Sequence, residues 1–186
     1  MKPSLFLHSC CAPCLTSVYE KLQDSFRVTV FWYNPNIFPK EEFDKRLNCL
    51  VDYCNKQKIN LVISKTNYAK EHLNWIKKIK GLEKDKEKGQ RCNVCFEFRL
   101  NVTGKAAKIY GADYFGTELS VSPHKDAEEI NKIGQKISTN LNIQFLSSDF
   151  KKEDGFVKSV ELSKKHGLYR QNYCGCEFSK QANKSP

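Results

Sequence analysis

Short runs of apolar residues alternate with longer amphipathic segments along almost the whole chain. The short runs have the length and composition of buried strands. The run at 27–33, RVTVFWY, is rich in the β-branched and aromatic residues that favour strands. Asn34, Pro35 and Asn36 follow it and predict a turn. In all, strands are predicted at 4–7, 27–33, 60–64, 113–117 and 143–146.

Between these runs, apolar residues recur at helical spacing. After Pro39, which is typical of a helix start, Phe43, Leu47, Leu50 and Cys54 fall on one helical face. Further helices are predicted at 15–22, 68–79, 92–110 and 156–166 and around Ile130, Ile133 and Ile137, with an irregular tail at 168–179. The alternation predicts one α/β domain over 1–186, with a mainly parallel sheet and helices on both faces.

Parallel sheets of this kind bind ligands beyond the carboxyl ends of their strands. The segment that follows the first predicted strand begins with Cys10 and Cys11 and reaches Cys14. We therefore expect this loop to lie at the functional edge of the sheet.

Composition and charge indicate the kind of partner and the cellular compartment of the protein. The 186 residues carry 31 Lys and Arg against 21 Asp and Glu, a formal net charge of +10, which favours a polyanionic partner over a merely solvated surface. The mean hydropathy is −0.59, and no apolar run has the length of a membrane span. The N-terminus lacks the apolar core of a signal peptide, so we expect a cytoplasmic protein.

Nine cysteines are unusual in such a protein, because the cytosol keeps structural thiols reduced. Cys49 and Cys54 stand alone, and Cys54 lies on the apolar helix face, as expected of structural residues. Seven others are clustered, which favours an iron–sulfur site, although a structural Cys₄ zinc site remains an alternative. The clustered residues are Cys10, Cys11, Cys14, Cys92, Cys95, Cys174 and Cys176.

Cys174 and Cys176 are separated only by Gly175. A disulfide across one residue would be strained and labile, which suits a redox pair. Gly175 would also allow the backbone to turn so that both sulfurs reach a metal ion. Both interpretations stay open on the residues alone.

The segment 77–91 is a predicted basic insertion that leads into Cys92. Its excess of Lys and Arg is suited to guiding a nucleic acid toward the cysteines. It contains Lys77, Lys78, Lys80, Lys84, Lys86, Lys88 and Arg91. Tyr169, Arg170, Tyr173 and Phe178 surround the last two cysteines and are of the types that stack on an unpaired base.

Five stretches together resemble one family, the cobalamin-independent epoxyqueuosine reductases of the QueH type. These stretches are LHSCCAPC at 7–14, FWYNPNIFP at 31–39, EKGQRCNVCFEFRL at 87–100, TELSVSPHK at 117–125 and LYRQNYCGCEFS at 168–179. They occur in order over essentially the whole chain. Two positions depart from the family pattern: Cys14 is not always cysteine in the family, and Glu118 stands where threonine is expected.

The resemblance implies a Rossmann-like, three-layer domain related to nucleotide hydrolases. It also implies reduction of the epoxide of epoxyqueuosine at the tRNA wobble position, with a [4Fe–4S] cluster, a possible second mononuclear iron and no cobalamin. We predict that Cys10, Cys11, Cys92 and Cys95 hold the cluster. Cys174 and Cys176 would be the redox pair or the ligands of the second iron, in the tail 168–179 that closes the site.

Partners follow from the same reaction. The substrate is tRNA that carries epoxyqueuosine in its anticodon, and a ferredoxin or flavodoxin is the expected electron donor. Two alternatives are an iron–sulfur tRNA-thiolating enzyme and a zinc-stabilised RNA-binding module without catalysis. The first would need ATP, and the sequence has no glycine-rich phosphate loop.

Overall fold

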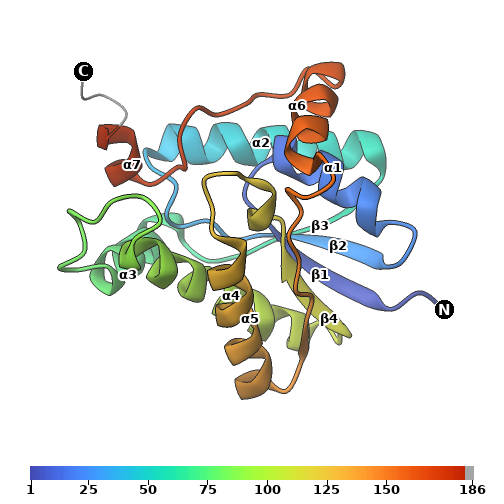
Figure 1. Cartoon of the computed structure of the whole chain (residues 1–186), viewed down its shortest axis with the longest axis horizontal. Coiled ribbons are helices and arrows are strands. Elements are labelled where there is room, and N and C mark those ends of the chain that lie inside the picture. The colour runs from blue at the N-terminus through green and yellow to red at the C-terminus, as the bar shows by residue number, and fades with distance from the viewer. Residues whose placement is uncertain (183–186) are drawn as a thin grey trace.

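Five parallel strands form one sheet at the centre of the protein. The computed structural model describes residues 1–182. The strands are β1 (Ser4–Ser9), β2 (Arg27–Trp32), β3 (Asn60–Ile63), β4 (Tyr114–Thr117) and β5 (Gln144–Phe145). Their order is β3-β2-β1-β4-β5, and every described pairing is parallel. The predicted α/β, Rossmann-like fold is confirmed (Figure 1).

Helices connect the strands close to the positions that the hydrophobic pattern predicts. They are α1 (Ala12–Leu22), α2 (Lys40–Gln57), α3 (Tyr68–Lys78), α4 (Gln90–Ile109), α5 (Ala127–Leu141), α6 (Gly155–Lys165) and α7 (Glu177–Ala182). One prediction is wrong: the tail 168–179 is not irregular throughout, because α7 begins at Glu177. The structure also adds a 3₁₀ turn, Leu119–Val121, directly after β4.

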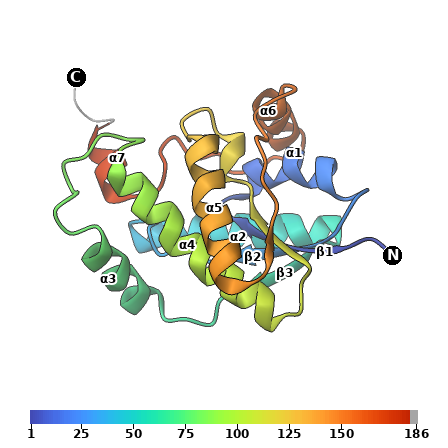
Figure 2. The same ribbon diagram turned by 60° about the horizontal axis from the view of Figure 1, so that its bottom comes forward.

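Alternate residues of β1 serve opposite faces of the sheet, as the strand period of two requires. Leu5 and Leu7 pack in the core beneath α1 and α2, whereas Phe6 packs in a second core beneath α4 and α5. Helix α6 lies against α1 on the first face. Figures 1 and 2 show α1, α2 and α6 on one side of the sheet and α3, α4 and α5 on the other.

The strand order places a topological switch point between β1 and β4. From β1 the chain proceeds outward through β2 and β3, whereas β4 and β5 lie on the other side of β1. Cys10 follows the end of β1, and Glu118 follows the end of β4. The two loops therefore meet at the crevice where such sheets bind ligands.

His8, at the end of β1, helps to fix this crevice. Its ring is fully buried and lies 3.0 Å from Thr117 Oγ1, 3.2 Å from the Tyr33 carbonyl oxygen and 3.2 Å from Asn34 Oδ1. Burial lowers the pKa of His8 to about 3, so the ring is neutral. His8 therefore ties the ends of three neighbouring segments together as a structural residue.

Within residues 1–182, no helix combines the length and the apolar character that crossing a membrane would require.

Candidate metal centre

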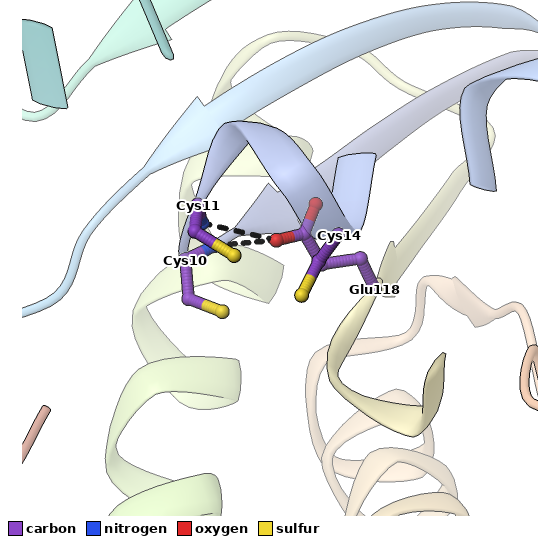
Figure 3. A group of neighbouring side chains, drawn as sticks. All are labelled: Cys10, Cys11, Cys14 and Glu118. Carbon is purple, nitrogen blue, oxygen red and sulfur yellow. Dashed lines mark hydrogen bonds between the residues drawn. The ribbon is translucent and has the colours of Figure 1, made fainter. Parts of the chain in front are cut away.

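The loop after β1 gathers three thiols and one carboxylate. Cys11 is the N-cap of α1 in an extended conformation, and Pro13 and Cys14 both lie in the first turn of the helix. The Sγ atoms of Cys10, Cys11 and Cys14 and a carboxylate oxygen of Glu118 all lie within 4.8 Å of one another. Figure 3 shows these four side chains converging on one point at the start of α1.

Glu118 is fully buried at this point. Its Oε1 accepts hydrogen bonds from the backbone N–H groups of Cys10, at 2.9 Å, and Cys11, at 3.1 Å (Figure 3). Its Oε2 has no hydrogen-bond partner among the described residues. Burial and the nearby Cys10 sulfur raise the pKa of Glu118 well above its ordinary value, because they disfavour its negative charge. A bound cation would remove this disadvantage.

The three thiols differ in how readily they ionise. Burial opposes ionisation of Cys11, but hydrogen bonds from the Cys10 and Cys14 thiols and from Gln171 outweigh it and hold the pKa of Cys11 well below its ordinary value. The Gln171 Nε2 atom lies 3.0 Å from Cys11 Sγ. Conversely, the hydrogen bond to Cys11 raises the pKa of Cys10 to about 12. Cys11 is thus the preferred thiolate, at the N-terminus of a helix.

A second group of cysteines lies outside the set of donor atoms that fall within 4.8 Å of one another. Cys92 and Cys95 are one turn apart near the start of α4, so their side chains share one helix face. Cys176 packs with Cys95 beside Trp75. Cys174 lies close enough to Cys92 and Cys95 for its charge to raise the pKa of both thiols, in addition to the effect of burial.

Cys174 itself is the preferred thiolate of this second group. A hydrogen bond from Cys176 and the positive charge of Lys125 hold the pKa of Cys174 well below its ordinary value, although burial opposes them. Lys125 Nζ donates to Cys174 Sγ over 3.0 Å. Lys125 belongs to the motif at 117–125, where sequence reasoning had assigned it no role.

The segment that carries Cys174 and Cys176 is held by α2 and the turn before it. Arg46 donates to the carbonyl oxygens of Tyr173, at 3.2 Å, and Cys174, at 3.3 Å, and forms a 2.6 Å ion pair with Glu42. The Gly175 carbonyl accepts a 2.8 Å hydrogen bond from the backbone N–H of Phe38. Gly175 has φ +114°, a conformation that side-chain-bearing residues rarely adopt.

A cavity of about 460 Å³ adjoins both groups. Cys10 and Cys14 line it from the first loop, and Cys174 lines it from the C-terminal segment. His124 and Asn172 contribute polar groups to its wall. The cavity is therefore large enough for a substituent of a nucleoside and has sulfur atoms on its wall.

The other cysteines behave as structural residues. Cys54 is buried in the core between α1, α2 and the sheet, and Cys49 packs against the same core, as predicted. All nine cysteines are free thiols in this structure, including Cys174 and Cys176.

Two features of the predicted RNA-binding surface need correction. Arg91 is buried, not part of an exposed basic strip, and its Nη1 donates to the carbonyl oxygens of Leu82, Glu83 and Asp85. Phe178 is not free to stack on a base, because its ring packs on Trp75. The lysines of the segment are exposed, as predicted: Lys77, Lys78, Lys80, Lys84, Lys86 and Lys88.

Comparison with known proteins identifies the family of this chain. The family described as "Epoxyqueuosine reductase QueH" matches residues 5–182. The chain belongs to the QueH family. It is 38% identical over 182 residues to "Epoxyqueuosine reductase QueH" of Staphylococcus epidermidis, covering 96% of this chain and 76% of that protein. A protein of the same name from Thermotoga maritima is 34% identical over 177 residues, covering 95% of this chain and 90% of that protein.

The donors of this QueH-family site fit a metal. Thiolate sulfur suits zinc and iron–sulfur clusters, and a carboxylate oxygen can complete a mixed set. Ligands bound tetrahedrally at about 2.3 Å lie roughly 4 Å apart, which is compatible with the 4.8 Å limit of the first group. The sequence motifs pointed to the cysteines, whereas Glu118 was noticed only as a departure from the family pattern.

Proposed function

We propose that this protein reduces the epoxide of epoxyqueuosine to the alkene of queuosine in the anticodon of tRNA. The observation that carries this proposal is the family match over residues 5–182 of a chain whose first-loop and C-terminal cysteines line one cavity. The reaction consumes two electrons and two protons and releases the epoxide oxygen as water. An enzyme with this substrate is expected in the cytoplasm.

We assign a [4Fe–4S] cluster to Cys10, Cys11, Cys92 and Cys95. Cys174 and Cys176 would then act as a redox pair or as ligands of a second iron. Cys14 and Glu118 lie beside Cys10 and Cys11. They are therefore suited to supply further ligands to a second metal ion at the loop after β1. A cluster held there would supply electrons one at a time, and an adjacent iron would act as a Lewis acid toward oxygen.

The chain's own residues would prepare the cavity for this chemistry. Gln171 and Lys125 hold Cys11 and Cys174 in their thiolate forms by hydrogen bonds of 3.0 Å. His124 and Asn172 offer polar groups to the hydroxyls of the cyclopentane ring. A wobble base is already unpaired, so its entry costs less than extraction from a duplex.

Partners of this reaction are tRNA and a low-potential electron donor such as a ferredoxin or flavodoxin. The exposed lysines between Lys77 and Lys88 support an approach of the RNA backbone toward Cys92, at the start of α4.

The activity is tested by mass spectrometry of nucleosides from tRNA incubated anaerobically with reduced protein. Epoxyqueuosine should lose one oxygen without added cobalamin or ATP, and cluster-free protein is the control. Untouched epoxyqueuosine, with sulfur added to another base when ATP is present, would instead support the tRNA-thiolating alternative. Protein that contains zinc and no acid-labile sulfide after anaerobic reconstitution would exclude the cluster.

The assignment of the cysteines is tested by serine variants. Cys92→Ser should bleach the visible absorbance of the cluster, whereas Cys174→Ser should retain most of it and lose turnover. Cys54→Ser is the matched control, because Cys54 lies in the apolar core outside the site. Retention of the cluster in Cys11→Ser together with its loss in Cys174→Ser would overturn the assignment.

A further inference from the structure

Two buried cations lie among the cysteines without a carboxylate partner. Arg99, on α4, is 2% exposed, and Lys125, after β4, is 8% exposed. Within residues 1–182, neither forms an ion pair with Asp or Glu. Burial of an uncompensated charge is costly, so both cations need negative charge from the groups around them.

Arg99 has more N–H donors than the acceptors around it can satisfy. Its Nε donates to the Cys95 carbonyl oxygen over 3.3 Å, and its Nη1 lies 3.5 Å from Asn34 Oδ1. Its Nη2 has no hydrogen-bond partner among the described residues. The sulfurs of Cys95, Cys10, Cys174 and Cys92 stabilise this guanidinium when they are ionised, and metal binding would require that ionised form.

Lys125 also lies among these cysteines. Its Nζ donates to Cys174 Sγ at 3.0 Å, and it shares the ring of Phe96 with Arg99, at 5.6 Å and 5.9 Å from the ring centroid. Other charged groups nearby are already compensated or neutral: Arg46 pairs with Glu42, and His8 is neutral. Glu118 faces the backbone N–H groups of Cys10 and Cys11.

We propose that Arg99 and Lys125 are the counter-charges of the sulfur-bound metal centre and set the potential at which it accepts an electron. A cluster held by thiolates is anionic, and reduction adds one more negative charge to it. Nearby cations and N–H donors to sulfur stabilise the reduced form more than the oxidised form, which raises the potential. The inference rests on the proposed metal centre and adds two positioning residues to it.

Removal of either charge should make reduction harder. The interaction between two unit charges a few ångströms apart changes the equilibrium constant for reduction by at least about tenfold, even with the screening typical of a protein interior. For a one-electron couple, about tenfold corresponds to about 59 mV. The midpoint potential of the cluster should therefore fall by at least about 59 mV in Arg99→Gln and in Lys125→Gln.

The experiment compares these two variants with Arg99→Lys and Lys125→Arg, which keep the charge. Lys108→Gln is the matched control, because Lys108 is an exposed cation on the same helix, about 13 Å further along it. Iron and acid-labile sulfide per chain are measured first, and the midpoint potential is then determined by an anaerobic redox titration followed by electron paramagnetic resonance. The charge-conserving variants should recover most of the shift, and Lys108→Gln should show none.

An unchanged midpoint in both glutamine variants, at wild-type cluster content, would overturn the inference. If a glutamine variant cannot hold the cluster, the charge-conserving variant at the same position decides the outcome. A cluster retained in that variant supports the counter-charge role. Loss of the cluster in both variants indicates a steric role and overturns the inference. Wild-type protein without iron and sulfide would instead refute the proposed metal centre itself, so the two failures are distinguishable.

Discussion

Glu42→Gln tests whether the buried ion pair on α2 anchors the C-terminal cysteines. The side chains of Arg46 and Glu42 are 1% and 12% exposed, and their atoms lie 2.6 Å apart. The substitution preserves the size of the side chain and an oxygen that accepts from Arg46. It removes the negative charge of Glu42, so that besides this neutral oxygen Arg46 keeps only two carbonyl oxygens, the ring of Tyr173 and the more distant charge of the Cys11 sulfur.

The expected cost follows from this burial. Breaking a buried ion pair by removing one partner costs about 3–5 kcal/mol. We expect the lower end, about 3 kcal/mol, because Arg46 keeps its hydrogen bonds to the carbonyl oxygens of Tyr173 and Cys174. With a urea m-value of about 2 kcal/mol/M, the unfolding midpoint should fall by about 1.5 M.

Asp44→Asn is the matched control on the same helix. Asp44 pairs with Lys40 at the same spacing of four residues, but the two side chains are 46% and 48% exposed. Exposed pairs of this kind contribute about 0.3–0.5 kcal/mol, so the midpoint should shift by less than about 0.3 M. Urea unfolding is followed by circular dichroism under anaerobic, reducing conditions, on samples matched for iron content. Equal shifts in the two variants would refute the reasoning.

Two further experiments test the site and the proposed RNA surface. Gly175→Ala should cost about 1–3 kcal/mol and reduce turnover, because φ is +114° and the new Cβ would lie 3.1 Å from Arg46 Nη1. Gly81→Ala, which also has positive φ but meets no atom within 4 Å, should leave turnover unchanged, and a fully active Gly175→Ala protein would contradict this prediction. Neutralising Lys84, Lys86 and Lys88 together should flatten the log–log salt dependence of tRNA binding by about 0.7–0.9 per lost phosphate contact. An unchanged slope would mean that these lysines do not contact RNA.

The fold was predictable because each element carries its own signal. The strand at RVTVFWY and the apolar face of the helix after Pro39 are local patterns, and both are confirmed. The short helix α7 was missed because six residues offer less than two turns of periodicity. Arg91 was assigned to the surface because it follows a run of lysines, and only the folded loop shows that its guanidinium binds backbone carbonyls.

Of the residues at the site, only the cysteines were predictable from the sequence. Closely spaced cysteines are rare enough to be informative on their own. Glu118 carries no such signal, since its backbone partners at Cys10 and Cys11 lie more than one hundred residues earlier in the chain. Arg99 resembles an ordinary helix charge in the sequence, and its significance comes only from its burial without a carboxylate. Charge compensation is a property of packing, and the sequence pattern does not contain it.

The two groups of cysteines differ in how they are positioned, and this difference bears on the proposed reaction. The first group follows β1 and is bound through Glu118 to the end of β4, so the paired strands hold its geometry. Cys174 and Cys176 belong to no strand. Hydrogen bonds from Arg46, Lys125 and the backbone at Phe38 hold their segment, and Cys176 packs with Cys95. The second group is therefore positioned by side-chain contacts rather than by strand pairing. Because Cys174 also lines the cavity, these contacts fix one thiol of the second group at the cavity wall, beside Cys10 and Cys14 of the first.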